Sequence, residues 1–440
     1  MTLDEARTLL ETHGIHTVEC AFPDTQGHMR GKRVPTAHFL RSTAEKGFAN
    51  ADAAFYWDVH CELFEMPHYD PAVDIVDMIV IPDLSTLRPI TWREGTAICL
   101  CNCISEHSRK PIPMDPRHLL RLQVERARAL GFEPVVATEI EFYLLDQDWK
   151  PLYETVQCYS LAKSGEYEGV ISDIRRTVES FGIVVEASNM EYGPAQVEIN
   201  MGREGAVEVA DSTMIFKNIV KEVALRHGYR TTFMAKPFNG ASGNGLHLHG
   251  SLERDGVNVY AERTDDEVLN NELMRRFVAG LCVHMPEMSL IANPSVNAYK
   301  RIEDYSFAPT NVSWGHDNRN VAVRCIPQAG GASRIEYRGA AADANPYLAI
   351  AAMLGAGLNG IERSLELPPA AETDAYADST QTRLPRTLMA AVDVFEQGSF
   401  ARDVFGPVFA ANYAAIARRE GQLYDAHVTE WEFKRYAEYA

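Results

Sequence analysis

The sequence predicts an α+β fold made of a small N-terminal domain and a large second domain. The chain has 440 residues, which is enough for two or more domains. A proline-containing stretch over 110–116 separates a region of short strands from a longer region in which strands and helices alternate. We find no internal repeat and no low-complexity tract. We therefore expect the second domain to be a large α/β or α+β unit.

The first domain, 1–108, is expected to contain few and short elements. Apolar residues at helical spacing predict a helix over 3–12. The stretch 47–75 is irregular and rich in aromatic residues, so we expect a loop with a functional role. Apolar, strand-like runs predict strands over 17–22, 78–81 and 96–103.

The second domain, 109–440, opens with a helix whose boundaries are marked. Asp115 can accept hydrogen bonds as its N-cap, Pro116 suits its first position, and Gly131 ends it. Further strands are expected at 133–145, 183–187, 195–200, 230–235, 246–252, 319–326 and 334–339. Further helices are expected at 168–181, 205–227, 267–284, 346–364, 383–396 and 427–438.

Composition excludes several classes of partner. The formal net charge of −19 argues against a nucleic-acid backbone or an anionic membrane as partner. No apolar run of membrane-spanning length is present, and the acidic N-terminus lacks the apolar core of an export signal. Eight cysteines are too sparse for a disulfide framework. We expect a reduced, cytoplasmic protein.

Two carboxylates in the strand 133–145 suggest a metal site. Glu139 and Glu141 are two residues apart in an apolar run, so their side chains point to the same face of a strand. Buried like charges repel and are costly to desolvate, and a divalent cation between them would remove that cost. The alternative at this point is a half-exposed strand with a solvated acidic face.

Four later segments carry the same kind of chemistry. Glutamates stand at both ends of a Pro-containing turn, Glu191 and Glu198. His247, His249 and Ser251 share one strand face, after two glycines, and Arg334, Glu336 and Arg338 share another. Arg319 and Arg324 flank a further expected strand.

Each of these segments taken alone has an ordinary explanation. A strand histidine is usually a satisfied polar residue, an Arg-Glu-Arg alternation is usually an ion-paired face, and the glutamates could be surface acids. Together they place oxygen ligands and an imidazole in one domain, which suits Mg²⁺ or Mn²⁺ better than zinc. Arginines beside such ions are what phosphoryl transfer needs. The sequence has no GxxxxGK[ST] loop, which excludes a P-loop.

These motifs, in this order and spacing, resemble those of the glutamine synthetase family, in its bacterial type I branch. The resemblance covers nearly the whole chain and implies an N-terminal β-grasp domain, a C-terminal catalytic barrel and stacked hexameric rings whose active sites are shared between neighbouring subunits. It rests on Asp24…Arg30-Gly-Lys32, Glu139-Ile-Glu141, Glu191-Tyr-Gly-Pro-Ala-Gln-Val-Glu198, Gly243-Asn-Gly-Leu-His247-Leu-His249-Gly-Ser251, Asn293-Pro…Lys-Arg301, Asn318-Arg319, Arg334-Ile-Glu-Tyr-Arg338 and Ala344-Asn-Pro-Tyr-Leu348.

The resemblance also implies a role for each position, with at least two divalent ions per site and ATP as co-substrate. The implied ligands of one metal are Glu141, Glu191 and Glu198, and those of the other are Glu139, His247 and Glu336. The implied glutamate site contains Arg301, Arg338 and Gly243. The implied phosphate-neutralising residues are Arg319, Arg324 and Arg334, and the implied nucleotide contacts are Glu186, His249 and Ser251.

Departures from the family pattern suggest a different acceptor. Phe307 stands where glutamine synthetases carry a flap glutamate that helps to bind and deprotonate ammonium, and Asp52 is the equivalent of the other ammonium-site acid, in a more aromatic loop. A phenyl ring cannot accept a proton, so the chain is similar to the γ-glutamyl-amine ligases, which use polyamines, ethanolamine or alkylamines. Glu303 and Asp304 could hold a distal ammonium, or form a solvated acidic loop. The rival hypotheses are an ammonia-using glutamine synthetase and a catalytically inactive relative.

Overall fold

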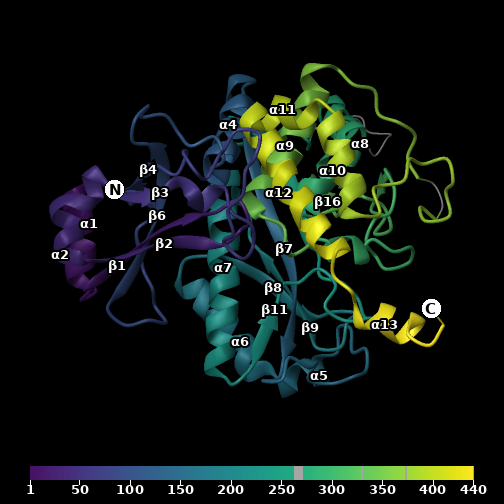
Figure 1. The fold of residues 1–440 in the computed structure, drawn as a ribbon, viewed down its shortest axis with the longest axis horizontal. Helices are drawn as coiled ribbons and strands as arrows, with labels where there is room; N and C mark the ends of the chain where they lie inside the picture. Colours follow the sequence, from purple (N-terminus) through teal and green to yellow (C-terminus); the bar gives the residue numbers. More distant parts are fainter. Residues whose placement is uncertain (262–270, 329–330, 372–373, 440) are drawn as a thin grey trace.

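The computed structural model describes residues 1–261, 271–328, 331–371 and 374–439, and its strands lie in two β-sheets. The first sheet has six strands and lies to the left in Figure 1, in purple and blue. The second has ten strands and forms the middle of the molecule beneath most of the helices. The structure is therefore a mixed helix and strand fold, as the sequence predicts.

The small sheet has the order β2-β1-β6-β4-β3, and β5 pairs with β6. Its central pair, β1 and β6, is parallel, while β2, β3 and β4 pair in antiparallel fashion. The helix expected at 3–12 is present, and its N-cap Thr2 forms a capping box with Glu5. The elements here are α1 (Leu3–Thr12), β1 (Thr17–Pro23), β2 (Met29–Pro35), α2 (Thr36–His38), α3 (Ala44–Lys46), β3 (Phe48–Ala51), β4 (Asp77–Pro82), β5 (Arg88–Pro89) and β6 (Thr96–Ser105).

Two features of this region differ from the sequence expectation. Strand β2 was not expected, because its sequence is mostly polar and only Val34 is buried, so apolar alternation gives no signal. The stretch 47–75, expected to be a loop, begins with strand β3 and a 3₁₀ helix, Asp52–Phe55.

The large sheet has the order β14-β15-β16-β12-β7-β9-β8. From Glu133 to Phe142 its central strand β7 alternates between buried residues, such as Ile140, and more exposed ones, such as Glu139 and Glu141. The main strands are β7 (Glu133–Leu145), β8 (Val185–Met190), β9 (Gln196–Met201), β12 (Leu246–Arg254), β14 (Trp314–His316), β15 (Val323–Ile326) and β16 (Arg334–Tyr337). Short strands β10 (Glu204–Gly205), β11 (Arg230–Thr232) and β13 (Val257–Asn258) add to β7 and β12.

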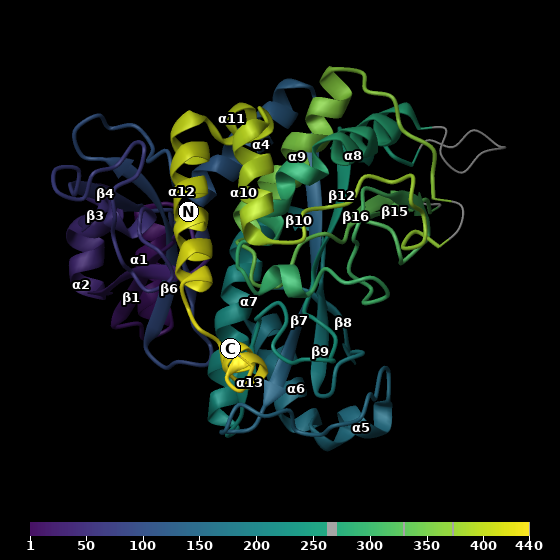
Figure 2. The same ribbon diagram turned by 45° about the vertical axis from the view of Figure 1, so that its right-hand side comes forward.

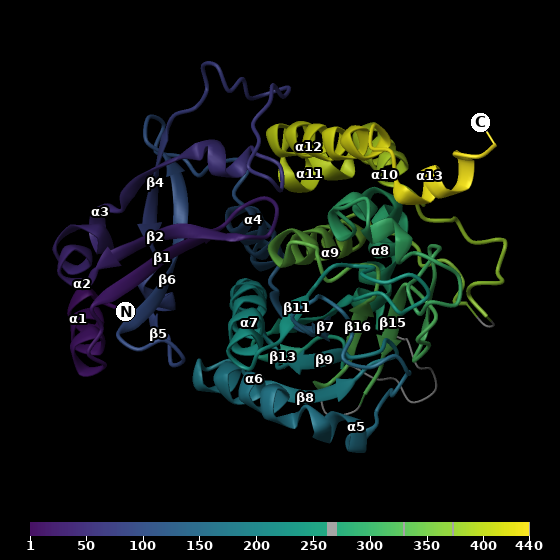
Figure 3. The same ribbon diagram turned by 60° about the horizontal axis from the view of Figure 1, so that its bottom comes forward.

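Helices cover the large sheet in layers. Figure 3 shows α10, α11 and α12 as an outer layer above α8 and α9, with the sheet beneath, and Figure 2 shows the same stacking from another side. Helices α8 and α9 approach closely, since a Cβ on Gly280 would lie 2.0 Å from the Ala356 carbonyl oxygen. The helices are α4 (Pro116–Ala129), α5 (Leu161–Glu166), α6 (Glu168–Ser180), α7 (Ala206–Arg226), α8 (Glu272–Ala292), α9 (Pro346–Glu362), α10 (Leu388–Gln397), α11 (Phe400–Phe405), α12 (Pro407–Asp425) and α13 (Glu430–Tyr436).

Some boundaries in this region correct the sequence expectation. Helix α8 was expected over 267–284; positions 267–270 lie outside the described residues, and the helix runs on to Ala292, past Pro286. The strand expected over 319–326 begins only at Val323. Helices α11 and α12 were not expected. In α12, alanines occupy buried and partly exposed positions alike, which blurs the apolar stripe. No helix within the described ranges is both long and apolar enough to cross a membrane.

Candidate active site on the large sheet

Strand register brings the predicted acidic residues together. On β7, Glu139 lies opposite His247 of β12, and Glu141 lies opposite Glu198 of β9. Glu336 of β16 lies opposite His249 of β12. Because side chains alternate between the two faces of each strand, all six point to the same side of the sheet.

Glu139, His247 and Glu336 form a compact group that could hold a metal ion. One ligand atom from each lies within 4.8 Å of the others. Nδ1 of His247 is 3.4 Å from a Glu139 oxygen and 3.6 Å from a Glu336 oxygen, and Nε2 of His249 is 3.0 Å from the other Glu139 oxygen. Burial alone would raise the pKa of Glu139, but the two histidines outweigh it, so the pKa is lowered and the carboxylate is ionised. An ionised carboxylate pair with an imidazole suits Mg²⁺ or Mn²⁺.

A second group lies beside the first. Ligand atoms of Glu141, Glu198 and His247 also lie within 4.8 Å of one another. Burial and then the charges of Glu141, Glu139 and Glu191 raise the pKa of Glu198 to about 9. Crowded carboxylates with so high a pKa need either a proton or a cation, and a divalent cation fits this donor set.

Glu191 belongs to the same acidic region without joining either compact group. Its carboxylate accepts hydrogen bonds from the Asn189 side chain at 2.8 Å and from the Tyr192 backbone N–H at 3.1 Å. Burial and then the charge of Glu141 raise the pKa of Glu191 to about 7. His247 is a member of both compact groups. In the second group it takes the position beside Glu141 and Glu198 that the resemblance gives to Glu191.

Arginines surround this acidic centre. Arg324 donates to Glu336 at 3.1 Å, and Arg338 donates to the other oxygen of the same carboxylate. Nε of Arg334 lies 3.2 Å from Nδ1 of His249. Arg319 is exposed and close enough to Glu191 for its charge to oppose the rise of that pKa. The acidic centre therefore lies among four guanidinium groups.

Arg301 is buried beside a glycine loop. It donates to the Arg338 carbonyl at 3.3 Å, and its Nη1 is buried with no hydrogen-bond partner among the described residues. A Cβ on Gly243 would lie 2.7 Å from Arg301 Cγ, and one on Gly245 would lie 2.9 Å from both Arg301 Nη2 and His247 Nε2. Both positions therefore require glycine, and the free guanidinium nitrogen suits a carboxylate ligand.

The three implied nucleotide contacts line one cavity of about 330 Å³. Glu186 reaches it from a bulge in β8, where the register shifts between Val185 and Ala187. The cavity also adjoins the acidic centre. Its lining includes Glu139, Glu186, His249, Ser251 and Arg334.

Phe307 lies against an aromatic residue that the sequence did not single out. Its ring is edge-on to that of Tyr192, with centroids 5.4 Å apart, and both side chains are about half exposed, at 47% and 52%. Phe307 has a φ of 62°, which is strained for an aromatic residue, so its surroundings must hold it there. Nearby, Asp304 is engaged by Thr310 at 2.6 Å and Arg383 at 2.7 Å, which leaves it poorly placed to hold a distal ammonium.

Asp52 is not among the residues that this subunit gathers at the centre. It is buried in the N-terminal region, where it accepts from the Val76 backbone N–H at 3.3 Å. Burial, reinforced by Asp74, raises its pKa to about 6.

Sequence reasoning also missed Gln196, whose side chain connects Glu141 of β7 to the glycine loop at Gly243 and Asn244. Its buried side-chain amide donates to Glu141 at 3.1 Å, to the Gly243 carbonyl at 3.0 Å and to Asn244 at 3.0 Å. The sequence could have indicated Gln196 by its position between Glu191 and Glu198, because a polar residue buried there needs several hydrogen-bond partners.

A model of the glutamine synthetase catalytic domain matches residues 113–436. The chain belongs to the glutamine synthetase family. Like other members of the family, it is a carbon–nitrogen ligase of the kind that uses ATP. Its place within the family is indicated by two curated relatives. It is 37% identical to the glutamate–isopropylamine ligase of Pseudomonas sp, covering 98% of this chain and 97% of that one. It is 35% identical to the γ-glutamylethanolamide synthetase GlnA4 of Streptomyces coelicolor, covering 98% and 95%.

A solved structure shows the same fold. The chain superposes on the GmaS/ADP complex with a TM-score of 0.88 and 29% identity, covering 98% of this chain and 99% of that one. The glutamine synthetase fold therefore extends over the N-terminal region as well as the catalytic domain.

Proposed function

We propose that this enzyme phosphorylates the γ-carboxylate of glutamate with ATP and condenses the product with a primary amine to a γ-glutamyl amide. The observation that carries the proposal is the aromatic pair Phe307–Tyr192, because the family resemblance implies an ammonium-binding glutamate at position 307. The names of the two curated relatives, which specify isopropylamine and ethanolamine, support the same class of acceptor. A polyamine, ethanolamine or alkylamine fits this proposal.

Two metal ions, Mg²⁺ or Mn²⁺, fit the acidic centre. We assign Glu141, Glu191 and Glu198 to one ion and Glu139, His247 and Glu336 to the other. The 4.8 Å grouping of the second set supports its assignment. When bound, the ions neutralise charge on the phosphate groups during transfer. Glu141 and Glu139 lie on one strand face, so the chain itself sets the spacing between the two ion positions.

The remaining residues position the two substrates. The unpartnered Nη1 of Arg301 and the side chain of Arg338 are suited to the α-carboxylate of glutamate, with Gly243 leaving room for it. The 330 Å³ cavity suits the nucleotide, with Glu186, His249 and Ser251 along its wall. Three arginines would stabilise the negative charge on the phosphoryl group during its transfer: Arg319, Arg324 and Arg334.

The acceptor amine lies against Phe307 and Tyr192 in this proposal. An alkyl stem gains by leaving water for an aromatic surface, at about 25 cal/mol per Å² of apolar area removed from water. Ammonia has no stem and gains nothing there. Glu191 directly precedes Tyr192 in the chain and accepts a hydrogen bond from its backbone N–H, so the proposed metal ligand and the aromatic surface adjoin each other.

The wider architecture follows the family. We propose a β-grasp domain over 1–108 and a catalytic barrel over 109–440, assembled into stacked hexameric rings. Asp52 is not among the residues grouped at its own subunit's acidic centre, which supports a site shared between neighbours, in which Asp52 serves the adjacent subunit.

A phosphate-release assay tests the function. Glutamate and Mg·ATP are supplied with isopropylamine, ethanolamine, putrescine or ammonia, and the product is identified by mass spectrometry. The proposal expects at least one primary amine to give a kcat/KM well above that of ammonia. Faster turnover with ammonia than with every amine would make the chain a glutamine synthetase. No phosphate release with any acceptor would make it a catalytically inactive relative.

A further inference from the structure

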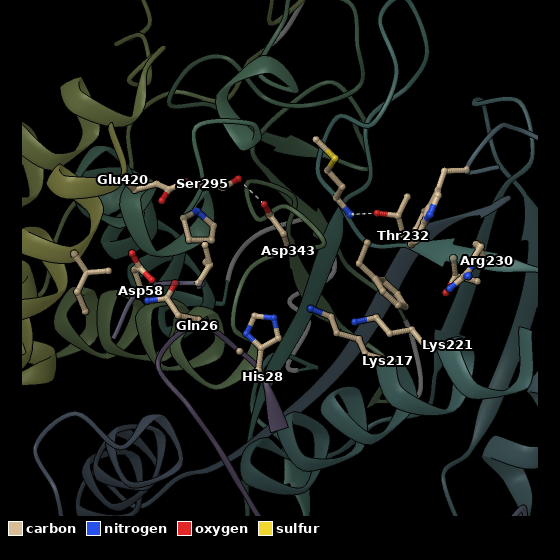
Figure 4. A pocket seen from close by; sticks show the side chains of 18 of the residues that line it. Gln26, His28, Asp58, Lys217, Lys221, Arg230, Thr232, Ser295, Asp343 and Glu420 are labelled. Atoms are coloured by element: carbon tan, nitrogen blue, oxygen red, sulfur yellow. Dashed lines mark hydrogen bonds between the residues drawn. The ribbon is translucent and has the colours of Figure 1, made fainter. Parts of the chain in front are cut away.

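A cavity of about 580 Å³ lies apart from the metal centre, between the N-terminal region and the helices of the second domain. None of the residues assigned to metals, glutamate, nucleotide or amine lines it. Figure 4 shows side chains converging on it from the turn after β1, from α7 and β11, and from α12. Its volume lies in the range that small-molecule sites occupy, about 300–1,000 Å³.

One wall of the cavity carries basic side chains. Burial lowers the pKa of Lys217 to about 7 and also lowers that of Lys221, so a bound anion would favour their charged forms. Lys217 and Lys221 are one turn apart on α7, and both point into the cavity in Figure 4. Lys217 is buried, and its ammonium donates to the carbonyls of Ala342 at 2.6 Å and Ala344 at 3.2 Å, which uses two of its three protons. Lys221 has no hydrogen bond or ion pair within the described residues.

A third cation stands at the end of this wall. Arg230 of β11 lies over the Trp149 ring, and its Nε is buried without an acceptor among the described residues. Lys221 is exposed and can be solvated by water, but the buried Nε of Arg230 would gain an acceptor from an anion bound at this wall.

The opposite side of the cavity offers a hydrogen-bond acceptor. One oxygen of Asp343 accepts from Ser295 at 2.6 Å, while the other, Oδ1, is buried with no partner in the described structure. Asp343 and Lys217 line the same space, and the charge of Asp343 partly offsets the effect of burial on the pKa of Lys217, although no ion pair within 4.0 Å joins them among the described residues. The other acids are elsewhere engaged or distant: Asp58 accepts from two backbone N–H groups at 2.9 Å, and Glu420 lies at the far side in Figure 4.

Between the charged walls the cavity is apolar. The Phe233 ring lies 5.6 Å from Lys217 Nζ and 5.9 Å from Lys221 Nζ. Ile416 and Tyr413 of α12 and Leu225 of α7 complete this surface. A ligand with a charged end and an apolar body would match both parts.

We propose that this cavity binds a small organic anion that carries a hydrogen-bond donor, with the anionic group between Lys217 and Lys221, the donor at Asp343 and the apolar body against Phe233. The cavity spans two regions of the chain that are already tied together, since Asn345 donates to the Asp24 carbonyl at 3.0 Å beside it. Bound ligand therefore reinforces the contact between the N-terminal turn and the second domain.

Calorimetric titration of the full-length oligomer tests the proposal, with glutamate and Mg·ADP at saturation so that the catalytic site is filled. The probes are L-phenyllactate, which has an anion, a donor and an apolar body; phenyl phosphate; 3-phenylpropionate, which lacks the donor; and neutral 2-phenylethanol. We expect phenyllactate or phenyl phosphate to bind, the tighter one identifying the anion as carboxylate or phosphate, and 2-phenylethanol not to bind. Loss of the hydroxyl should weaken binding by about tenfold.

Variants locate the binding. Lys221→Met should weaken the better anion by about tenfold or more, because it removes a charge-assisted hydrogen bond, while amine-dependent phosphate release stays at the wild-type rate. Lys46→Met, at an exposed position outside the cavity, is the matched control. Leu225→Trp, at the exposed rim, should also reduce binding by filling the cavity. The proposal is overturned if neither anion binds, or if Lys221→Met and wild type bind with equal affinity; equal affinity of phenyllactate and 3-phenylpropionate contradicts the role of Asp343.

Discussion

The ring of Phe307 meets the ring of Tyr192 edge-on, and Tyr192 directly follows Glu191 in the chain. The same short stretch thus carries a carboxylate with a raised pKa and one half of an aromatic pair. In the proposed function, a metal ligand and part of the surface that recognises the alkyl group are therefore adjacent residues. The proposed function assigns the acceptor preference to this ring pair, and the first two predictions test its two members.

Phe307→Glu should raise the kcat/KM for ammonia relative to that for isopropylamine by about tenfold or more, because a carboxylate holds a small cation by a charge-assisted hydrogen bond. Steady-state phosphate release with both acceptors measures the ratio. Tyr305→Glu is the matched control, since Tyr305 is exposed, has a similar positive φ and packs on Tyr376 instead. An unchanged ratio in Phe307→Glu would show that this position does not set specificity.

Tyr192→Ala should raise the KM for alkylamines by about two- to tenfold, since an aromatic pair contributes about 0.5–1.5 kcal/mol beyond its buried area. The KM for glutamate should stay constant. Tyr192→Phe keeps the ring and should behave as wild type. A loss of similar size in the phenylalanine variant would assign the effect to the hydroxyl and contradict the packing argument.

Gln196→Leu should reduce the apparent affinity for Mg²⁺ or Mn²⁺ by about 10- to 100-fold, the usual effect of losing a group that orients a metal ligand. The side-chain amide is shared by Glu141, Gly243 and Asn244, so its loss frees the carboxylate and the glycine loop together. Activity as a function of metal concentration measures the change. Gln147→Leu removes an exposed glutamine bound to Gly228 and serves as the control; equal metal dependence in the two variants would contradict the positioning role.

The metal-free enzyme should lose stability as pH rises from about 5 to 9. The pKa of Glu198 is raised from 4.5 to about 9 in the folded chain, so the folded state binds more protons than the unfolded state between these values. The stabilising contribution is complete below the unfolded pKa and is lost as pH rises through the folded one. Bound Mg²⁺ replaces the proton, so the increase in unfolding temperature on adding Mg²⁺ should be larger at pH 9 than at pH 6.

Thermal unfolding scans at several pH values measure this effect. Glu198→Gln should flatten the pH dependence of the metal-free protein, because the amide does not titrate. If Mg²⁺ raised the unfolding temperature equally at both pH values, the crowding of carboxylates would not be what the metal relieves.

Asp52→Asn and Glu336→Gln should each abolish most activity alone and restore part of it when coexpressed. If neighbours share a site, random mixing in a closed ring leaves about a quarter of the sites with both native residues. Specific activity of the purified mixed oligomer measures the recovery. A mixed oligomer as inactive as either parent would place both residues in one subunit's site, or remove Asp52 from it.

The large sheet and its acidic face could be predicted from alternation alone. Strand side chains alternate between faces with a period of two, so the spacing predicts one face for Glu139 with Glu141 and one face for His247 with His249. Alternation does not specify pairing between strands, so the sharing of His247 between two ligand groups appeared only in three dimensions.

Long-range contacts were the part that local patterns could not supply. In the sequence, nothing distinguishes Gln196 from other polar strand residues. Its role becomes visible only in the structure, where it bonds to the glycine loop. The cavity beside helix α12 brings together residues some 200 positions apart, such as Lys217 and Ile416. The helix itself was not predicted because its many small alanines form no clear apolar stripe.

The positions of the proposed metal ligands are fixed by backbone hydrogen bonds between strands, because Glu139 pairs with His247 and Glu141 pairs with Glu198. A single-residue insertion early in β7 that shifted its register would turn Glu139 and Glu141 toward the core, so this half of the enzyme resists change. Phe307 and Tyr192, by contrast, stand on turns outside the ladders, where substitutions leave the register untouched. Natural variation and directed evolution can therefore exchange one amine for another while the machinery that activates glutamate is inherited intact.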